Sequence, residues 1–323
     1  MKEVQPMAAV DGVVTRLEEA RIPVMDRGFL YGDSVYEVFR TYEGVPLFMA
    51  DHFDRLAHSA SLISMEVSQS REALIEEIRA TVRATGATHE HDLYVRYQIT
   101  RGVGAVDLYP GDVQLTTSVI IVKSVPVWNP DYYRKGMAMA IPRVRRNPVD
   151  SLDPNIKGGN YLNNVIAVTQ ARQLGADDCV MLDHRDFVTE CGNSNIWFVI
   201  DDQLKTPDAG NLRGLTKKHL HIALAEEGYQ SIETPIHLDQ VSRASECFVT
   251  SATREVMPCR SLRLEDGSQI SFPEGGGEVT RRTRKVSVGI FETTSTCTVR
   301  IGCYDKPLTI VWCGMHLAQA ILV

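Results

Sequence analysis

The pattern of apolar and polar positions near the start of the chain predicts a β-strand. Residues 34–42, SVYEVFRTY, are rich in β-branched and aromatic side chains. Strand alternation divides these side chains between two faces. One face carries Tyr36, Val38 and Arg40, and the other carries Val35 and Phe39. If the second face fills a core, the first is free to line a binding site.

Helical spacing follows this strand. Apolar residues over 51–65 recur as one stripe of a helix, and Arg55 lies off that stripe. A second helix is expected over 72–84. The stretch DLYVRYQIT, residues 92–100, then alternates as a strand, with Tyr94, Arg96 and Gln98 on its polar face.

The later part of the chain mixes strands and helices. A strand over 113–125 is followed by PVWNP, whose two prolines indicate a linker. Further strands are expected at 137–144, 178–183, 195–201 and 246–251, with helices at 160–174 and 216–227. Both helices stop at a glycine, Gly175 and Gly228, as C-terminal caps would.

This order of elements predicts two domains. A small α+β domain covers residues 1–125, a linker covers 126–135, and a larger mixed α/β domain covers 136–285. The remaining stretch, 286–323, is rich in threonine, valine and cysteine and shows no helical stripe. We therefore expect an atypical C-terminal tail.

Composition narrows the class of protein. The 323 residues are 44% hydrophobic and 23% charged, as in soluble globular proteins. A net charge of −7 argues against a nucleic-acid partner or an anionic membrane partner, and no apolar run approaches the roughly 18 residues of a membrane span. The seven cysteines, an odd number without a CxxC pair, favour reduced thiols. With no signal-peptide core at the N-terminus, we expect a cytoplasmic protein, and the histidine spacing predicts no metal site.

Four residues are candidates for chemistry, although each has an ordinary explanation when taken alone. Lys157 precedes two glycines in NIKGGNYLNN, but most lysines simply lie in solvent. Arg55 is explained as a solvated helix residue, Glu190 as a turn residue between two strands, and Thr216 as a helix N-cap. Their order along the chain changes this balance.

Seven segments occur in an order typical of one enzyme family. They are DRGFLYGDSVYEVFRTYEG, HFDRLAHSA, YVRYQITRG, KGGNYLNN, VTECGNSNIWFV, LKTP with LRGLTK, and FVTSATREVMP, and together they span about residues 20–285. In these segments the chain resembles the class IV aminotransferases, the fold-type IV group of pyridoxal-phosphate (PLP) enzymes. That group includes branched-chain and D-amino-acid aminotransferases and aminodeoxychorismate lyase. The resemblance implies the two-domain α+β fold of the D-amino-acid aminotransferase type.

The resemblance assigns roles around the ring of PLP. Lys157 matches the lysine that binds the cofactor as a Schiff base and moves the α-proton of the substrate. Gly158 and Gly159 leave room for the backbone. Tyr161 matches the tyrosine that faces the phenolate oxygen, although ordinary helix packing also explains it. Glu190 matches the acid that keeps the pyridine nitrogen protonated.

The resemblance also assigns residues to the phosphate of PLP. Arg55 matches the phosphate arginine, and Leu215 and Thr216 would offer N–H groups at the start of a helix. The loop TSATRE would close the site through Ser251, Ala252 and Thr253. Two positions depart from the family pattern. Ala252 stands where threonine is usual and Lys217 where arginine is frequent, so we expect weaker cofactor retention.

Substrate residues are expected on the polar strand faces of the small domain. They are Tyr36, Val38, Arg40, Tyr94 and Arg96. A half-solvated sheet face explains the pattern equally well without the resemblance.

The choice of reaction within the family depends on two short stretches. YVRYQ resembles the YIRP of branched-chain enzymes, whereas YQITRGVG is closer to D-amino-acid enzymes but lacks their arginine-x-histidine pair. We expect an aminotransferase that moves the amino group of a branched-chain L-amino acid to a 2-oxo acid such as 2-oxoglutarate. A D-amino-acid aminotransferase and aminodeoxychorismate lyase are alternatives on the same fold. The unusual tail keeps open a non-catalytic PLP-binding protein, and the family implies a homodimer.

Overall fold

The strand expected over residues 34–42 is present as β3 (Ser34–Tyr42), and it belongs to an antiparallel sheet of six strands. Their order is β2 (Val13–Arg16), β1 (Met7–Val10), β6 (Thr117–Ser124), β5 (Leu93–Thr100), β3 and β4 (Val45–Pro46). The structure is a computed structural model that describes residues 3–111 and 115–297, with side chains as far as residue 290. The chain forms two compact units. One consists of Met1–Pro126 and Lys157–Asn160, and the other of Val127–Ile156 and Tyr161–Ile290.

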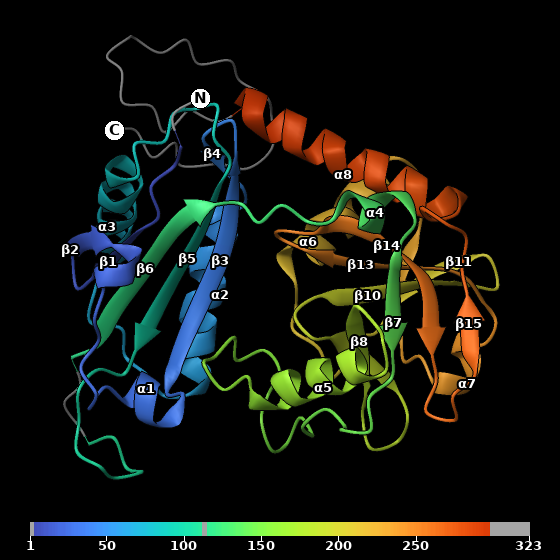
Figure 1. Ribbon diagram of the computed structural model, residues 1–323, viewed down its shortest axis with the longest axis horizontal. Coiled ribbons are helices and arrows are strands. Elements are labelled where there is room, and N and C mark those ends of the chain that lie inside the picture. Colours follow the sequence, from blue (N-terminus) through green and yellow to red (C-terminus); the bar gives the residue numbers. More distant parts are fainter. Residues whose placement is uncertain (1–2, 112–114, 298–323) are drawn as a thin grey trace. The chain divides into compact units, whose positions relative to one another are not determined.

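The first unit is an α+β layer structure. Its elements are β1 (Met7–Val10), β2 (Val13–Arg16), the 3-10 turn η1 (Leu17–Glu19), α1 (Arg27–Tyr31), β3 (Ser34–Tyr42), β4 (Val45–Pro46), α2 (Met49–Leu62), α3 (Arg71–Ala84), β5 (Leu93–Thr100) and β6 (Thr117–Ser124). Helices α2 and α3 cover one face of the sheet (Figure 1). Val35, Phe39, Val95 and Tyr97 are buried on this face, as the alternation predicts. The opposite face carries the polar residues.

The second unit is built on a sheet of nine strands. Its elements are α4 (Pro130–Arg134), β7 (Met137–Ala140), α5 (Leu162–Gln173), β8 (Asp178–Leu182), β9 (Val188–Cys191), β10 (Asn195–Ile200), β11 (Gln203–Thr206), α6 (Leu215–Glu226), β12 (Ser231–Glu233), α7 (Leu238–Val241), β13 (Ala244–Ser251), β14 (Glu255–Arg263), β15 (Gln269–Ser271) and α8 (Glu278–Cys297). The strand order is β12-β11-β10-β13-β14-β7-β8-β9, with β15 paired to β14. Because β9 also lies close to β10, the sheet curls around its core.

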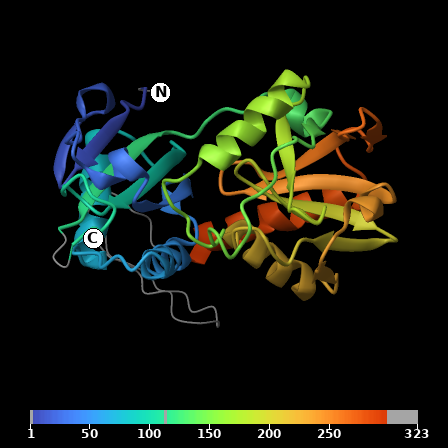
Figure 2. The ribbon, with the colours of Figure 1, turned by 90° about the horizontal axis from the view of Figure 1, so that it is seen from below.

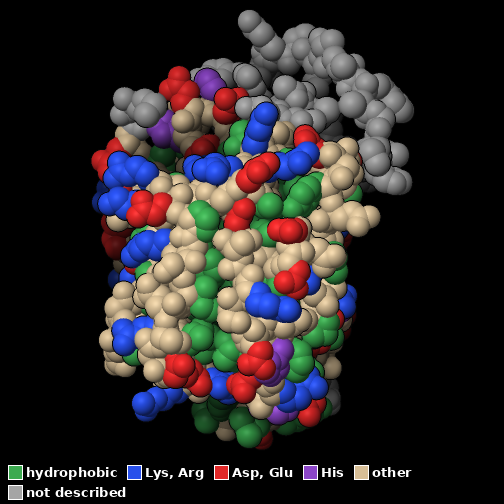
Figure 3. Space-filling model, turned by 90° about the vertical axis from the view of Figure 1, so that its right-hand side faces the viewer, with side chains coloured by type: hydrophobic (Ala, Val, Ile, Leu, Met, Phe, Trp, Pro, Cys, Tyr) green, Lys and Arg blue, Asp and Glu red, His purple; other side chains and the backbone are tan. Residues whose placement is uncertain are grey.

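Helices lie on both sides of this curled sheet. Figure 2 shows α5 on one side and α6 with α8 on the other. Methionines, cysteines and branched residues of β7–β10, β13 and β14 fill the interior. Trp197 and Phe248 of the sheet pack in one cluster with Leu220 of α6 and Val286 of α8. On the face of this unit that Figure 3 shows, basic and acidic side chains are interspersed.

Three expectations differ from the structure. The stretch 126–135, expected to be a linker, contains α4, and Asn129 caps this helix by accepting from the Asp131 N–H. Thr216 is not an N-cap, because α6 begins at Leu215 and Gly214 occupies the cap position. The expected tail also begins too early, since α8 continues through 286–297 and buries Val286. The remainder of that tail, 298–323, lies outside the described residues.

Candidate active site

The backbone of Lys157 is fixed against the edge of β3. The Tyr36 N–H donates to the Lys157 carbonyl oxygen at 2.8 Å, and the Gly159 N–H donates to the Ser34 carbonyl oxygen at 2.9 Å. The Lys157 N–H donates to the Ser59 hydroxyl of α2 at 3.2 Å. Three hydrogen bonds therefore hold this short segment to a strand and a helix. They fix the backbone position from which the Lys157 side chain extends.

Gly159 explains why a glycine follows this lysine. A β-carbon at Gly159 would lie 2.4 Å from the Ser34 hydroxyl oxygen and 3.1 Å from the Gly32 carbonyl oxygen. Only a residue without a side chain permits the backbone to approach β3 this closely. The close pairing in turn directs the Lys157 side chain over Tyr36, where Nζ lies 4.5 Å from the ring centroid and donates to the hydroxyl at 3.4 Å.

The polar face of the first sheet gathers several of the expected substrate residues. The register pairs Tyr36 with Gln98 and Val38 with Arg96, so these residues are neighbours across β3 and β5. The Arg96 guanidinium lies 3.6 Å from the centroid of the Tyr36 ring and donates to Gln98 at 2.8 Å. Tyr36 thus contacts two cations, Arg96 and Lys157, which makes this part of the face attractive to a carboxylate.

Arg40 and Tyr94 lie farther along the same face. Arg40 forms an ion pair of 2.7 Å with Asp92 and covers the Tyr42 ring at 4.0 Å. Its charge is therefore matched by an acid of its own unit. The centroid of the Tyr94 ring lies 5.4 Å from Lys123 Nζ, and burial raises the pKa of the Tyr94 hydroxyl. These two residues are paired across β3 and β5 on the polar face, as expected.

Arg55 is held by the buried carboxylate of Glu37, which was not among the expected site residues. Its Nε and Nη2 each donate to Glu37 of β3 at 2.7 Å, and His52 Nδ1 lies 2.7 Å from the same carboxylate. Burial raises the pKa of Glu37, but the hydrogen bonds and charge of Arg55, with those of His52, outweigh it and lower the pKa to about 2. Burial lowers the pKa of His52, whereas the neighbouring Glu37 carboxylate acts to raise it. Arg55 therefore has a fixed orientation.

The signal for this buried group is present in the sequence. Glu37 alternates with Val35 and Phe39 on the core face of β3, where a charge is expected only with a partner. Helix α2 places His52 and Arg55, about one turn apart, opposite Glu37. An acid on an apolar strand face, followed by a basic residue off the stripe of the next helix, predicts such a pair.

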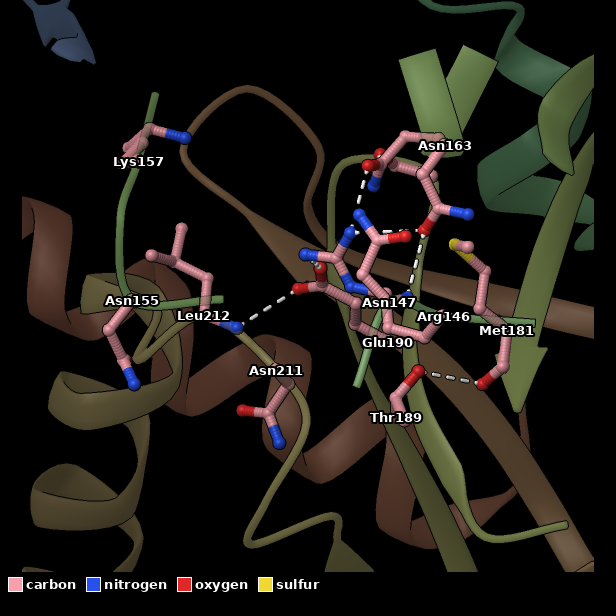
Figure 4. Close-up of polar contacts among 12 residues, drawn as sticks. Arg146, Asn147, Asn155, Lys157, Asn163, Met181, Thr189, Glu190, Asn211 and Leu212 are labelled. Carbon is pink, nitrogen blue, oxygen red and sulfur yellow. Dashed lines mark hydrogen bonds and ion pairs between the residues drawn. The ribbon is translucent and has the colours of Figure 1, made fainter. Parts of the chain in front are cut away.

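In the second unit, Glu190 lies at the end of β9 and is buried. Its Oε1 pairs with Arg146 Nη2 at 2.7 Å, and its Oε2 accepts from the Leu212 N–H at 3.1 Å (Figure 4). An ion pair and a backbone donor both stabilise the charged carboxylate and fix its plane. Glu190 is therefore suited to hold a proton on a heterocyclic nitrogen.

Arg146 connects Glu190 to the start of α5. Its Nη1 donates to Asn164 Oδ1 at 3.0 Å, and Asn164 Nδ2 donates to the Gly192 carbonyl oxygen at 2.9 Å. Arg146 was not among the expected site residues, so this role was missed. A sequence signal was available, since the arginine occurs shortly before a segment rich in asparagine. The contact with the Leu212 N–H had no such signal, because it involves the backbone.

The start of α6 offers N–H groups with a helix dipole behind them. Gly214 precedes Leu215 and Thr216, and as the N-cap residue it has no side chain to cap this end. A β-carbon at Gly214 would lie 1.9 Å from Asn195 Oδ1, so the close packing of this turn requires glycine. The Lys217 side chain is directed to Glu233, where Nζ lies 2.8 Å from Oε2. Lys217 therefore anchors the helix.

The loop between β13 and β14 is held by side chains from outside it. The Trp128 indole donates to the Thr253 carbonyl oxygen at 2.9 Å, and the Tyr133 hydroxyl donates to the Arg254 carbonyl oxygen at 3.2 Å. The Ser251 hydroxyl accepts from the Arg254 N–H at 3.2 Å, which leaves its own proton available to donate. Ser251 can therefore supply a hydroxyl contact where Ala252 has none.

The expected site residues are divided between the two units. The first unit contains Lys157 together with Tyr36, Val38, Arg40, Arg55, Tyr94 and Arg96. The second contains Glu190 together with Tyr161, Leu215, Thr216, Ser251, Ala252 and Thr253. Tyr161 immediately precedes α5, and its carbonyl oxygen accepts from the Val165 N–H. Within 3–111 and 115–297, no three metal-binding side chains form a cluster and no helix has the length and hydropathy to cross a bilayer.

Comparison with known proteins gives a consistent result. The family model for amino-transferase class IV matches residues 34–262. The chain is 34% identical over 270 residues, 83% of its length, to a putative branched-chain-amino-acid aminotransferase of Methanocaldococcus jannaschii, and the match covers 90% of that protein. It is also 31% identical to a D-alanine aminotransferase of Listeria monocytogenes, over 83% of this chain and 90% of the other.

Solved structures show the same fold. The crystal structure of the Escherichia coli branched-chain amino acid aminotransferase is similar with a TM-score of 0.81 and 26% identity, covering 90% of this chain and 95% of that chain. The branched-chain amino acid aminotransferase of Thermobaculum terrenum in its PLP form shares the fold with a TM-score of 0.77 and 22% identity, over 91% of this chain and 96% of that chain. These neighbours are fold-type IV aminotransferases, so the expected fold class is confirmed.

Proposed function

Because the chain belongs to the class IV aminotransferases, we propose that it moves the amino group of a branched-chain L-amino acid to a 2-oxo acid such as 2-oxoglutarate. The observation that carries the proposal is the fixed position of Lys157, whose amine lies at the polar sheet face beside Tyr36 and Arg96. Branched-chain aminotransferases among the relatives and solved structures support the choice of substrate.

The described residues fit PLP as the cofactor. Glu190 is a buried, ion-paired carboxylate suited to a pyridinium nitrogen, and the uncapped start of α6 with the Ser251 hydroxyl suits a phosphate. Arg55 presents a guanidinium oriented by Glu37. When bound, PLP would act as an electron sink for the bonds at the substrate α-carbon. Tyr161 is proposed to face the phenolate oxygen of the ring.

The proposed roles of the chain's own groups follow from their chemistry. Lys157 Nζ takes the proton from the α-carbon of the amino acid and later returns a proton to the product, as general base and then acid. Glu190 keeps a proton on the ring nitrogen. Arg146 favours the ionised form of this carboxylate, and an ionised carboxylate favours a neighbouring positive charge. Arg96 and Tyr36 bind and orient the substrate carboxylate, with Val38, Arg40 and Tyr94 completing the face.

A spectroscopic half-reaction tests this proposal. The protein is loaded with PLP, and borohydride followed by mass spectrometry should place the cofactor on Lys157. L-leucine alone, with no acceptor, should then convert the visible band of bound PLP to the absorbance of the amine form. A response to D-alanine instead would favour the second candidate, which the similarity to D-alanine aminotransferases motivates. Release of pyruvate from aminodeoxychorismate would indicate the lyase, and binding of PLP without any of these reactions would indicate a non-catalytic protein.

We also propose that the chain forms a homodimer through an apolar surface of the first unit. This surface consists of exposed large side chains, Phe29, Val103, Val106, Leu108 and Tyr109. Arg27, which is buried beside them, donates to the carbonyl oxygens of Asp107 and Leu108 at 2.6 and 3.0 Å and holds the loop to α1. Exposed apolar patches of this kind commonly mark protein interfaces. Sedimentation of the protein and of Leu108→Asp tests the proposal, since the variant should shift a dimer toward monomer.

A cytoplasmic location is proposed on the state of the cysteines. Cys179, Cys191, Cys247 and Cys259 are free and buried in the core of the second unit. Such unpaired thiols are typical of proteins that fold in a reducing compartment. Localisation of a tagged full-length chain by fractionation tests this assignment.

A further inference from the structure

Arg254 makes a buried ion pair that the proposed chemistry does not use. Its side chain is 8% exposed, and its Nη1 donates to Asp178 Oδ2 at 2.7 Å and to the Ser194 hydroxyl at 3.0 Å. Both partners are also buried. The guanidinium lies 4.9 Å from the centroid of the Trp128 ring. Arg254 therefore connects the loop between β13 and β14 with the start of β8 and with the loop after β9.

The ion pair of Arg254 and Asp178 is expected to contribute little net stability to the fold. Both charges lose their hydration, and apolar side chains of similar volume are often as stabilising as a buried ion pair. Arg254 Nε is in addition buried without a hydrogen-bond partner among the described residues, which costs further free energy. The ion pair instead fixes the orientation of the two groups, because the planar guanidinium donates its hydrogen bonds in set directions.

The same network leads from Arg254 to Glu190. A β-carbon at Gly192 would lie 2.8 Å from Asp178 Oδ1, so the loop after β9 packs directly on Asp178. The Gly192 carbonyl oxygen accepts from Asn164, and Asn164 in turn accepts from Arg146, the partner of Glu190. The acid proposed for the ring nitrogen and the loop proposed for the phosphate are thus joined within one unit by polar contacts and by the close packing of Gly192 on Asp178.

We propose that Arg254 is a positioning residue: its ion pair with Asp178 holds the loop Ser251–Arg254 in the conformation that binds the cofactor phosphate. The inference rests on the proposed function, which assigns Ser251, Ala252 and Thr253 to that phosphate. Arg254 acts through the loop, since its N–H orients the Ser251 hydroxyl and its side chain fixes the loop end. Its charge is neutralised by Asp178, so the effect on the phosphate is one of geometry and not of net charge.

The test compares PLP with pyridoxal, which has the same ring and aldehyde but no phosphate. Dissociation constants of both aldehydes are measured by absorbance and fluorescence titration for the full chain and for Arg254→Met. We expect the affinity for PLP to fall about 10-fold to 100-fold, as when an outer partner of a binding group is lost. The affinity for pyridoxal should change by less than about 3-fold, because the groups proposed for the ring stay in place.

Two further variants keep the inference falsifiable if Arg254→Met folds poorly. Arg254→Lys retains the charge but loses the planar fork, and should show a smaller loss that is again confined to PLP. Arg79→Met removes a buried arginine from α3 of the first unit, and should lower stability in urea without changing the ratio of the two affinities.

The outcomes separate the inference from the proposed function. Equal losses for PLP and pyridoxal, or no loss for PLP in Arg254→Met, would overturn the positioning role while leaving the aminotransferase assignment intact. A wild-type chain that binds neither aldehyde would overturn the proposed function itself. A loss confined to PLP, absent from Arg79→Met, would support the role of Arg254.

Discussion

Replacing Glu37 with glutamine removes one charge from a fully buried position and leaves the shape of the side chain unchanged. The carboxylate of Glu37 is inaccessible to solvent and accepts two hydrogen bonds from Arg55, each of 2.7 Å. In Glu37→Gln, one oxygen can still accept from Arg55 while the new amide faces the donors of Arg55 and His52. The Arg55 guanidinium is then largely buried without its counter-charge.

The size of the effect follows from the pKa of Glu37. Arg55 and His52 lower that pKa from 4.5 to about 2, against the opposing effect of burial. This difference corresponds to about 3 kcal/mol of stability at neutral pH. A carboxyl whose pKa is lowered on folding stabilises the protein above its ordinary pKa. That contribution is lost as the pH falls from about 4.5 toward about 2.

Urea unfolding between pH 7 and pH 3 measures this dependence. At pH 7, we expect the free energy of unfolding of Glu37→Gln to be about 3 kcal/mol lower than that of the natural chain. The difference between the two should shrink below about pH 4.5. Glu76→Gln is the control, since Glu76 pairs with Arg79 but has a side chain that is 59% exposed, and it should cost less than about 1 kcal/mol. A Glu37→Gln effect that is below about 1 kcal/mol at pH 7, or constant with pH, would show that Glu37 does not stabilise the fold through its charge.

Three further substitutions test other parts of the structure. Gly159→Ala should destabilise the chain by about 1 to 3 kcal/mol in thermal unfolding, because its β-carbon would lie 2.4 Å from the Ser34 hydroxyl oxygen; Ser34→Ala in the same chain should recover much of the loss. Lys157→Ala should reduce the transamination rate by about 100-fold to 10,000-fold without a matching loss of stability, and equal activity would contradict its assigned role. Val286→Ala should cost about 1 to 3 kcal/mol, because Val286 packs in the cluster of Trp197; an unchanged unfolding midpoint would show that α8 contributes little there.

Local patterns in the sequence predict about half of the regular elements that the structure describes. The alternation over 34–42 and 92–100 corresponds to β3 and β5 within one residue at each end, and the glycines at 175 and 228 follow α5 and α6 with positive φ. Period and capping are properties of neighbouring residues, so they are written in the sequence. The continuation of α8 beyond residue 285 was not predicted, because the valine and threonine content of this stretch is atypical of helices. Packing of Val286 against the cluster of Trp197 stabilises the middle of this helix.

The candidate site, like the fold, has features that the sequence predicts and features that only the tertiary structure determines. Residue types and their order were enough to identify the family, since Lys157, Glu190 and Arg55 each occur within a recognisable motif. The way in which these residues are held became visible only in the folded chain. Lys157 meets Tyr36 across 121 positions, and Glu190 is fixed by Arg146 and by a backbone N–H of Leu212. Local periodicity shows which face of an element is buried, but the partner on another element depends on how the chain folds back, which no short stretch of sequence contains.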